Sequence, residues 1–112
     1  GEVYAIVKAM VEHYDDYKSA AKGALGWKLD NQNMQWAMPY HAGAIKFFKE
    51  AGKWDAAAQK HQDMLVGRQA VIKKAWDALA GKDSMSKDEL KAAWKPARIA
   101  ALEAAGLDPI FK

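Results

Sequence analysis

The sequence contains no cysteine among its 112 residues. This absence excludes disulfide bonds, zinc–thiolate sites, iron–sulfur clusters and thiol catalysis. No apolar run approaches the ~18 residues that a membrane-spanning helix needs. Arginine is scarce, with Arg68 and Arg98 the only two, and the net charge is just +3. Because nucleic-acid surfaces are strongly basic and often use the planar arginine fork, we expect no nucleic-acid partner.

The composition is that of an ordinary single domain, with 51% hydrophobic and 28% charged residues. The chain does not begin with Met, and the first residues enter an amphipathic pattern without the basic start and apolar core of a signal peptide. This beginning fits a complete gene product and equally a piece of something longer.

Apolar residues recur at helical spacing throughout, and no run of β-branched residues indicates a strand. The sequence therefore predicts an all-α fold, a helical bundle. We expect four main helices near residues 2–19, 39–51, 55–80 and 86–105, plus a short helix before Pro39. Residues 20–26 are expected to form a loop.

Several residues mark the predicted ends of these helices. Asp55 is a candidate N-cap, Ser86 with Glu89 matches a capping box, and Gly52 follows the second main helix. Gly81 and Gly106 are expected to follow the third and fourth. Pro96 lies inside the last predicted helix and should kink or split it. The apolar tail, residues 107–111, is expected to dock on the domain.

Potential catalytic and metal-binding groups are scattered. His13, His41 and His61 belong to three different predicted helices, and Asp15 and Asp16 point in different directions on a helix. The chain has no phosphate-binding glycine loop and no nucleophile motif. We therefore expect no catalytic residue, metal site or cofactor, and a protein that is not an enzyme.

The five tryptophans are many for this length. Aromatic side chains among basic residues can stack on nucleic-acid bases. Here Trp76 and Trp94 occupy core positions of predicted helices, and Trp54 precedes one as a hydrophobic staple would. Core anchoring is therefore the favoured role of the tryptophans.

The stretch from Pro39 to Trp54 has a more particular pattern than a generic helix. It resembles the C-terminal part of the TAXI-type solute receptors of TRAP transporters, which show proline, an aromatic residue, histidine, Gly-Ala, paired aromatics, glycine and tryptophan in this order. The matching residues are Pro39, Tyr40, His41, Gly43, Ala44, Phe47, Phe48, Gly52 and Trp54. Where the family often has proline after the histidine, this chain has Ala42.

The resemblance implies two parts, a helical segment of residues 1–81 that is similar to the family and a C-terminal helical extension of residues 82–112 packing on the same domain. It implies a non-catalytic portion of a periplasmic solute-binding protein. Such receptors close two α/β lobes on an acidic solute, a dicarboxylate or amino acid, and deliver it to the membrane subunits of the transporter. Those lobes would lie upstream, so the resemblance assigns no ligand residue here. It implies structural roles: Pro39 starts a helix, Tyr40, Phe47 and Phe48 pack it, and Gly43 permits close approach.

A stand-alone helical module that binds another protein is the alternative. In either case, apolar positions such as Val3, Val7, Phe47 and Phe48 must be covered. Either repacking within the chain or a second copy of it covers them, and we favour the second copy, which predicts a homodimer.

Overall fold

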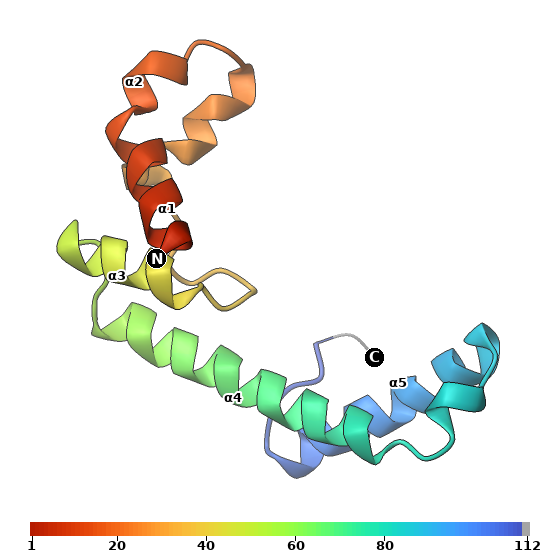
Figure 1. Ribbon diagram of the computed structural model, residues 1–112. Helices are drawn as coiled ribbons and strands as arrows, with labels where there is room; N and C mark the ends of the chain where they lie inside the picture. Colours follow the sequence, from red (N-terminus) through yellow and green to blue (C-terminus); the bar gives the residue numbers. More distant parts are fainter. Residues whose placement is uncertain (111–112) are drawn as a thin grey trace. The chain divides into compact units, whose positions relative to one another are not determined.

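The computed structural model describes residues 1–110, and these form two compact units. The first unit comprises Gly1–Asp63, and the second begins at Met64. Helices and turns make up the described chain, and no strand occurs within it (Figure 1). The predicted all-α fold is therefore confirmed. In the same described range, no helix has both the length and the apolar character needed to cross a membrane.

The first unit contains three α-helices of its own, two short 3₁₀ helices and the beginning of a long helix that continues into the second unit. In chain order these are α1 (Glu2–Glu12), α2 (Tyr14–Tyr17), η1 (Lys22–Trp27), η2 (Leu29–Asn31), α3 (Ala42–Glu50) and α4 (Ala56–Ala78).

The first predicted helix is interrupted at His13, where the backbone leaves the helical region (φ −99°, ψ 18°). Tyr17 donates its hydroxyl hydrogen to the carbonyl oxygen of Met10 at 2.7 Å. Carbonyls in the last turn of a helix lack partners within the helix, so this bond satisfies one of them. The tyrosine thereby holds the single turn of α2 against the end of α1.

The segment 20–26, expected to form a loop, belongs for the most part to the 3₁₀ helix η1, on which Ala24 is buried. The short helix expected directly before Pro39 is not formed: residues 32–41 are not helical, and the nearest helical turn is η2. The side chain of Asn31 donates to the carbonyl oxygen of Leu25 at 2.9 Å. This bond connects the two 3₁₀ helices and stabilises a segment whose sequence alone looks irregular.

The helix predicted to begin at Pro39 begins instead at Ala42, with His41 as its N-cap. The Nδ1 atom of His41 accepts a hydrogen bond from the backbone N–H of Gly43 at 3.0 Å. The end of the helix follows the prediction: Gly52 has a φ of +68°, and the N–H of Lys53 donates to the carbonyl of Phe48 at 2.8 Å.

Helices α1 and α3 pack closely through Gly43. A Cβ atom on Gly43 would lie 2.8 Å from the backbone nitrogen of Tyr4 and 3.2 Å from the Cβ of Val3. This close approach places Val3 and Val7 on the buried cluster of α3. The cluster consists of Ala44, Phe47 and Phe48, which are 4–8% exposed.

Val3, Val7, Phe47 and Phe48 are therefore covered within the first unit, whereas Ile6 of α1 is 59% exposed. Phe47 and Phe48 are buried there and do not supply a surface for a second copy. Tyr4 adds a polar contact between the helices, donating its hydroxyl hydrogen to Oε2 of Glu50 at 2.6 Å. The homodimer stays a prediction.

The second unit contains the remainder of α4, the 3₁₀ helix η3 (Lys82–Ser84) and α5 (Lys87–Ala104). Trp76 of α4 and Trp94 of α5 meet edge to face, with ring centroids 5.1 Å apart. Leu102 is fully buried. These contacts confirm that Trp76 and Trp94 anchor helix packing.

The predicted helix ends are confirmed at most positions. Asp55 accepts the N–H of Ala58 at 2.7 Å, Ser86 and Glu89 form the capping box, and Gly106 has a φ of +70°. Helix α4 ends at Ala78, two residues before the predicted end, although Gly81 has the expected positive φ of 73°.

Pro96 does not split the last helix, because α5 continues through it. Proline removes one backbone donor. The remaining hydrogen bonds and the burial of Leu102 maintain the helix on its C-terminal side.

The tail docks in part: Pro109 is buried, whereas Ile110 is 62% exposed. Arg98 donates to the carbonyl oxygen of Pro109 at 3.0 Å. Arg68 donates in the same way to the carbonyl oxygen of Asp108. Phe111, the last member of the predicted apolar tail, lies outside the described residues.

Two glycines in helices provide a matched test of the α1–α3 contact. We expect Gly43→Ala to lower the free energy of unfolding by about 1–3 kcal/mol, because the added Cβ would meet the α1 backbone. Gly67→Ala in α4 meets nothing within 4 Å and should raise it by about 0.5–1 kcal/mol through helix propensity. Urea unfolding followed by circular dichroism measures both. Stabilisation by both substitutions would contradict the close contact.

Candidate functional site

The extended segment before α3 is held by one buried side chain of α4. The backbone N–H of Tyr40 donates to Oε1 of Gln62 at 2.8 Å, and Nε2 of Gln62 donates to the carbonyl oxygen of Tyr40 at 3.0 Å. Gln62 is only 8% exposed. The carboxamide thus pairs with the backbone of Tyr40 as a neighbouring strand would, which explains why the helix does not start at Pro39.

The ring of Tyr40 stands at the centre of an aromatic cluster. It meets Phe48 and Trp54 edge to face, with centroid distances of 5.5 and 5.8 Å. Its hydroxyl donates to the carbonyl oxygen of Asn33 at 2.8 Å. Burial raises the pKa of the Tyr40 hydroxyl. Trp54 is fixed in turn by a hydrogen bond from Nε1 to Oε1 of Gln59 at 3.0 Å.

A cavity of about 160 Å³ lies in the first unit, beside this cluster. Its wall is mostly apolar and combines side chains of α1, η1 and α3 with two residues of the intervening segment. The lining residues are Val7, Met10, Val11, Trp27, Gln32, Tyr40, Ala44 and Phe48. We call it the inner cavity.

A wider and shallower hollow of about 440 Å³ adjoins the inner cavity, with Trp27, Gln32 and Tyr40 common to both walls. We call it the outer hollow. Its other lining residues are Gly26, Asn31, Asn33 and Trp36. The two tryptophans are 54% and 57% exposed. The expected core role of the tryptophans is therefore wrong for Trp27 and Trp36, whose indoles border an open surface.

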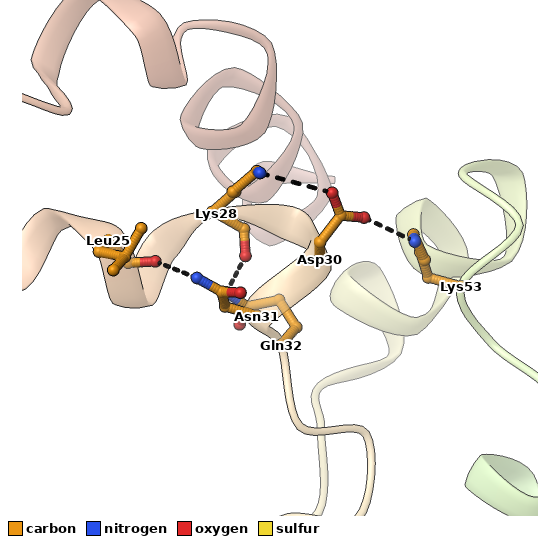
Figure 2. Close-up of polar contacts among 6 residues, drawn as sticks. All are labelled: Leu25, Lys28, Asp30, Asn31, Gln32 and Lys53. Carbon is orange, nitrogen blue, oxygen red and sulfur yellow. Dashed lines mark hydrogen bonds and ion pairs between the residues drawn. The ribbon is translucent and has the colours of Figure 1, made fainter.

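Side-chain hydrogen bonds fix the wall formed by η1 and η2 (Figure 2). The Nε2 atom of Gln32 donates to the carbonyl oxygens of Gly26 at 2.8 Å and Lys28 at 3.1 Å. The carboxylate of Asp30 lies 3.8 Å from Nζ of Lys28 and 2.7 Å from Nζ of Lys53. The hydrogen bond and the charge of Lys53 lower the pKa of Asp30.

The three histidines remain apart and serve different structural contacts. His13 pairs with Asp16 at 3.0 Å, His41 caps α3, and Nε2 of His61 lies 2.8 Å from the carbonyl oxygen of Trp36. Within residues 1–110, no three His, Asp or Glu side chains come together in a way that could hold a metal ion. Asp15 pairs with Lys18 at 2.7 Å, which lowers the pKa of Asp15.

All residues of the Pro39–Trp54 pattern lie in the first unit. Tyr40, Ala44 and Phe48 line the inner cavity. The sequence pattern did not single out Gln32 or Gln62, which hold the segment between η1 and α3. A lone glutamine carries no sequence signal that separates such a role from an exposed position.

The Gln62–Tyr40 pairing has a direct test. We expect Gln62→Leu to lower the free energy of unfolding by about 2 kcal/mol, because it leaves backbone groups of Tyr40 without partners. Gln69→Leu, at an exposed position of the same helix, should change it by less than about 0.5 kcal/mol. Chemical denaturation measures the difference, and equal effects of the two substitutions would contradict the pairing.

The Asp30–Lys53 pair predicts a pH dependence. Because the pKa of Asp30 is lowered in the folded protein, its contribution to stability is complete above the unfolded pKa of about 3.9 and disappears as the pH falls through the folded value. The melting temperatures of the parent and Asp30→Asn should therefore differ at pH 6 and converge toward pH 2. Asp83→Asn is the exposed control. A difference that grows in acid would have the wrong sign.

Comparison with known protein families gives a match within the first unit. Residues 1–52 match the NMT1-like family. No curated protein and no solved structure shows significant similarity to the chain. The matched segment runs from α1 to the glycine that follows α3, and so includes every lining residue of the inner cavity. Just under half of the chain is therefore similar to a family of the periplasmic binding-protein type.

Proposed function

We propose that the chain is the non-catalytic C-terminal helical portion of a periplasmic solute-binding protein that serves a TRAP transporter of the TAXI type. The observation that carries the proposal is the match of residues 1–52 to the NMT1-like family. The pattern from Pro39 to Trp54, which resembles TAXI receptors, overlaps this match and continues to the end of the aromatic cluster.

The structure of the first unit is compatible with a supporting role. Three of its polar side chains form hydrogen bonds with backbone groups of the same unit. His41 caps α3, His61 contacts the carbonyl of Trp36, and Gln62 pairs with Tyr40. Such groups position a rigid helical element and do not form a nucleophile–base pair. We propose accordingly that the protein is not an enzyme.

The solute that we propose is an acid, a dicarboxylate or an amino acid, held mainly by lobes upstream of this chain. Two-lobed binding proteins bury their solute between the lobes, because closure must remove it from water on both sides. In the proposed full-length receptor, the membrane subunits of the transporter are the partners that accept the solute.

Calorimetry on two proteins tests this function. The 112-residue chain should show no saturable heat with glutamate, 2-oxoglutarate or succinate, since the proposed lobes are not part of it. The product of the complete open reading frame should bind one of these acids with a saturable heat, and a neutral sugar is the control. Tight binding of an acid to the 112-residue chain alone would show that the site is misplaced.

The DNA upstream of the codon for Gly1 supplies a second readout. We expect a continuous reading frame with alternating strand and helix patterns, preceded by a signal peptide. A start codon directly before Gly1 would contradict the receptor and favour the stand-alone protein-binding module. Turnover of a substrate by the full-length product would contradict both functions.

A further inference from the structure

The inner cavity has the size and the lining of a site for one small ring. Its volume of about 160 Å³ is close to the roughly 150 Å³ at which an apolar protein cavity admits benzene. Val7, Met10 and Val11 of α1 contribute apolar side chains to its lining, together with Ala44 and Phe48 of α3. An apolar group that enters such a cavity gains van der Waals contacts on several sides.

Gln32 lines both the inner cavity and the outer hollow and brings a polar atom to their common wall. Its Nε2 atom is engaged by the carbonyl oxygens of Gly26 and Lys28, as Figure 2 shows for part of this network. These bonds fix the orientation of the carboxamide and leave Oε1 as the acceptor. A ligand that meets Gln32 should therefore carry a hydrogen-bond donor.

The walls of the inner cavity and outer hollow contain no charged side chain. The further polar groups are the hydroxyl of Tyr40, the indole N–H groups of the two tryptophans, and the carboxamides of Asn31 and Asn33 in the outer hollow. Burying a carboxylate or an ammonium group without a partner is strongly unfavourable. The lining thus favours a neutral ligand over an acid, in spite of the net positive charge of the chain.

We propose that the inner cavity binds a small neutral molecule with a single six-membered ring and a hydroxyl or N–H group. The ring occupies the apolar space between α1 and α3, and the donor bonds to Oε1 of Gln32. Trp27 and Tyr40 border the ring on the side of the outer hollow. This site is distinct from the acid site proposed for the upstream lobes and does not rest on that function.

Titration of the ¹⁵N-labelled 112-residue chain tests the proposal, with phenol as the probe. Binding should be saturable with a dissociation constant of about 1 mM, in the range open to a ligand of so few atoms. Chemical-shift changes should concentrate on Met10, Ala44, the indole N–H of Trp27 and the side-chain amide of Gln32. Toluene, which lacks the donor, should bind roughly three- to tenfold more weakly. Benzoate should not bind.

Two pairs of variants locate the site. Val7→Phe places a ring in the cavity and should abolish phenol binding, whereas Ile6→Phe, at an exposed neighbouring position, should leave it unchanged. Gln32→Met removes the acceptor and should reduce phenol affinity to that of toluene. Gln35→Met, which lies outside both walls, should not.

The proposal can still be tested if one of these variants does not fold. If Val7→Phe loses its helical circular dichroism, the Gln32→Met and Gln35→Met pair alone gives the answer. Absence of saturable shifts with phenol, equal affinity for benzoate, or identical phenol binding by Gln32→Met and the parent would each overturn it.

Discussion

The close contact between α1 and α3 at Gly43 is the constraint on which the first unit depends. A Cβ atom on residue 43 would lie 2.8 Å from the backbone nitrogen of Tyr4. Any side chain at this position would therefore push the two helices apart. Their approach brings Val3 and Val7 onto the phenylalanine pair and lets Tyr4 reach Glu50. The inner cavity lies between the same two helices, so the contact that forms the core also sets the width of the candidate site.

The pairing of Gln62 with Tyr40 positions Tyr40, which lines both the inner cavity and the outer hollow. It keeps residues 39–41 extended, and it therefore delays the start of α3 to Ala42 and presents the Tyr40 ring to Phe48 and Trp54. Gln62 belongs to α4, beyond the segment that matches the NMT1-like family. The structural unit of residues 1–63 thus extends beyond the matched segment of residues 1–52. The added part contains Gln62, whose side chain holds the backbone of Tyr40 inside the matched segment.

The two chemistries proposed for this protein have different physical origins. An acidic solute needs charged or donor groups that converge from two closing lobes. The inner cavity instead offers apolar side chains and a single oriented amide oxygen. The two proposals therefore do not compete for one place: the neutral ring is proposed for the inner cavity and the carboxylate for the lobes upstream of this chain.

The sequence by itself determined the features that depend on residues close together in the chain, namely helical segments and their ends. Helical spacing of apolar residues indicated the all-α fold, and the capping box at Ser86, the cap at Asp55 and the glycines after α3 and α5 marked helix ends, because these signals act within a few residues. The tertiary structure alone decided the start of α3, the continuity of α5 through Pro96 and the exposure of Trp27 and Trp36. It also brings residues of α1, η1 and α3 together around the inner cavity. Hydrogen bonds of Gln32 and Gln62 hold backbone segments that carry lining residues. A glutamine side chain can bond to any backbone group that the fold brings within reach. Tyr40 and Gln62 are 22 residues apart in the sequence, and local sequence patterns do not predict a hydrogen bond over that separation.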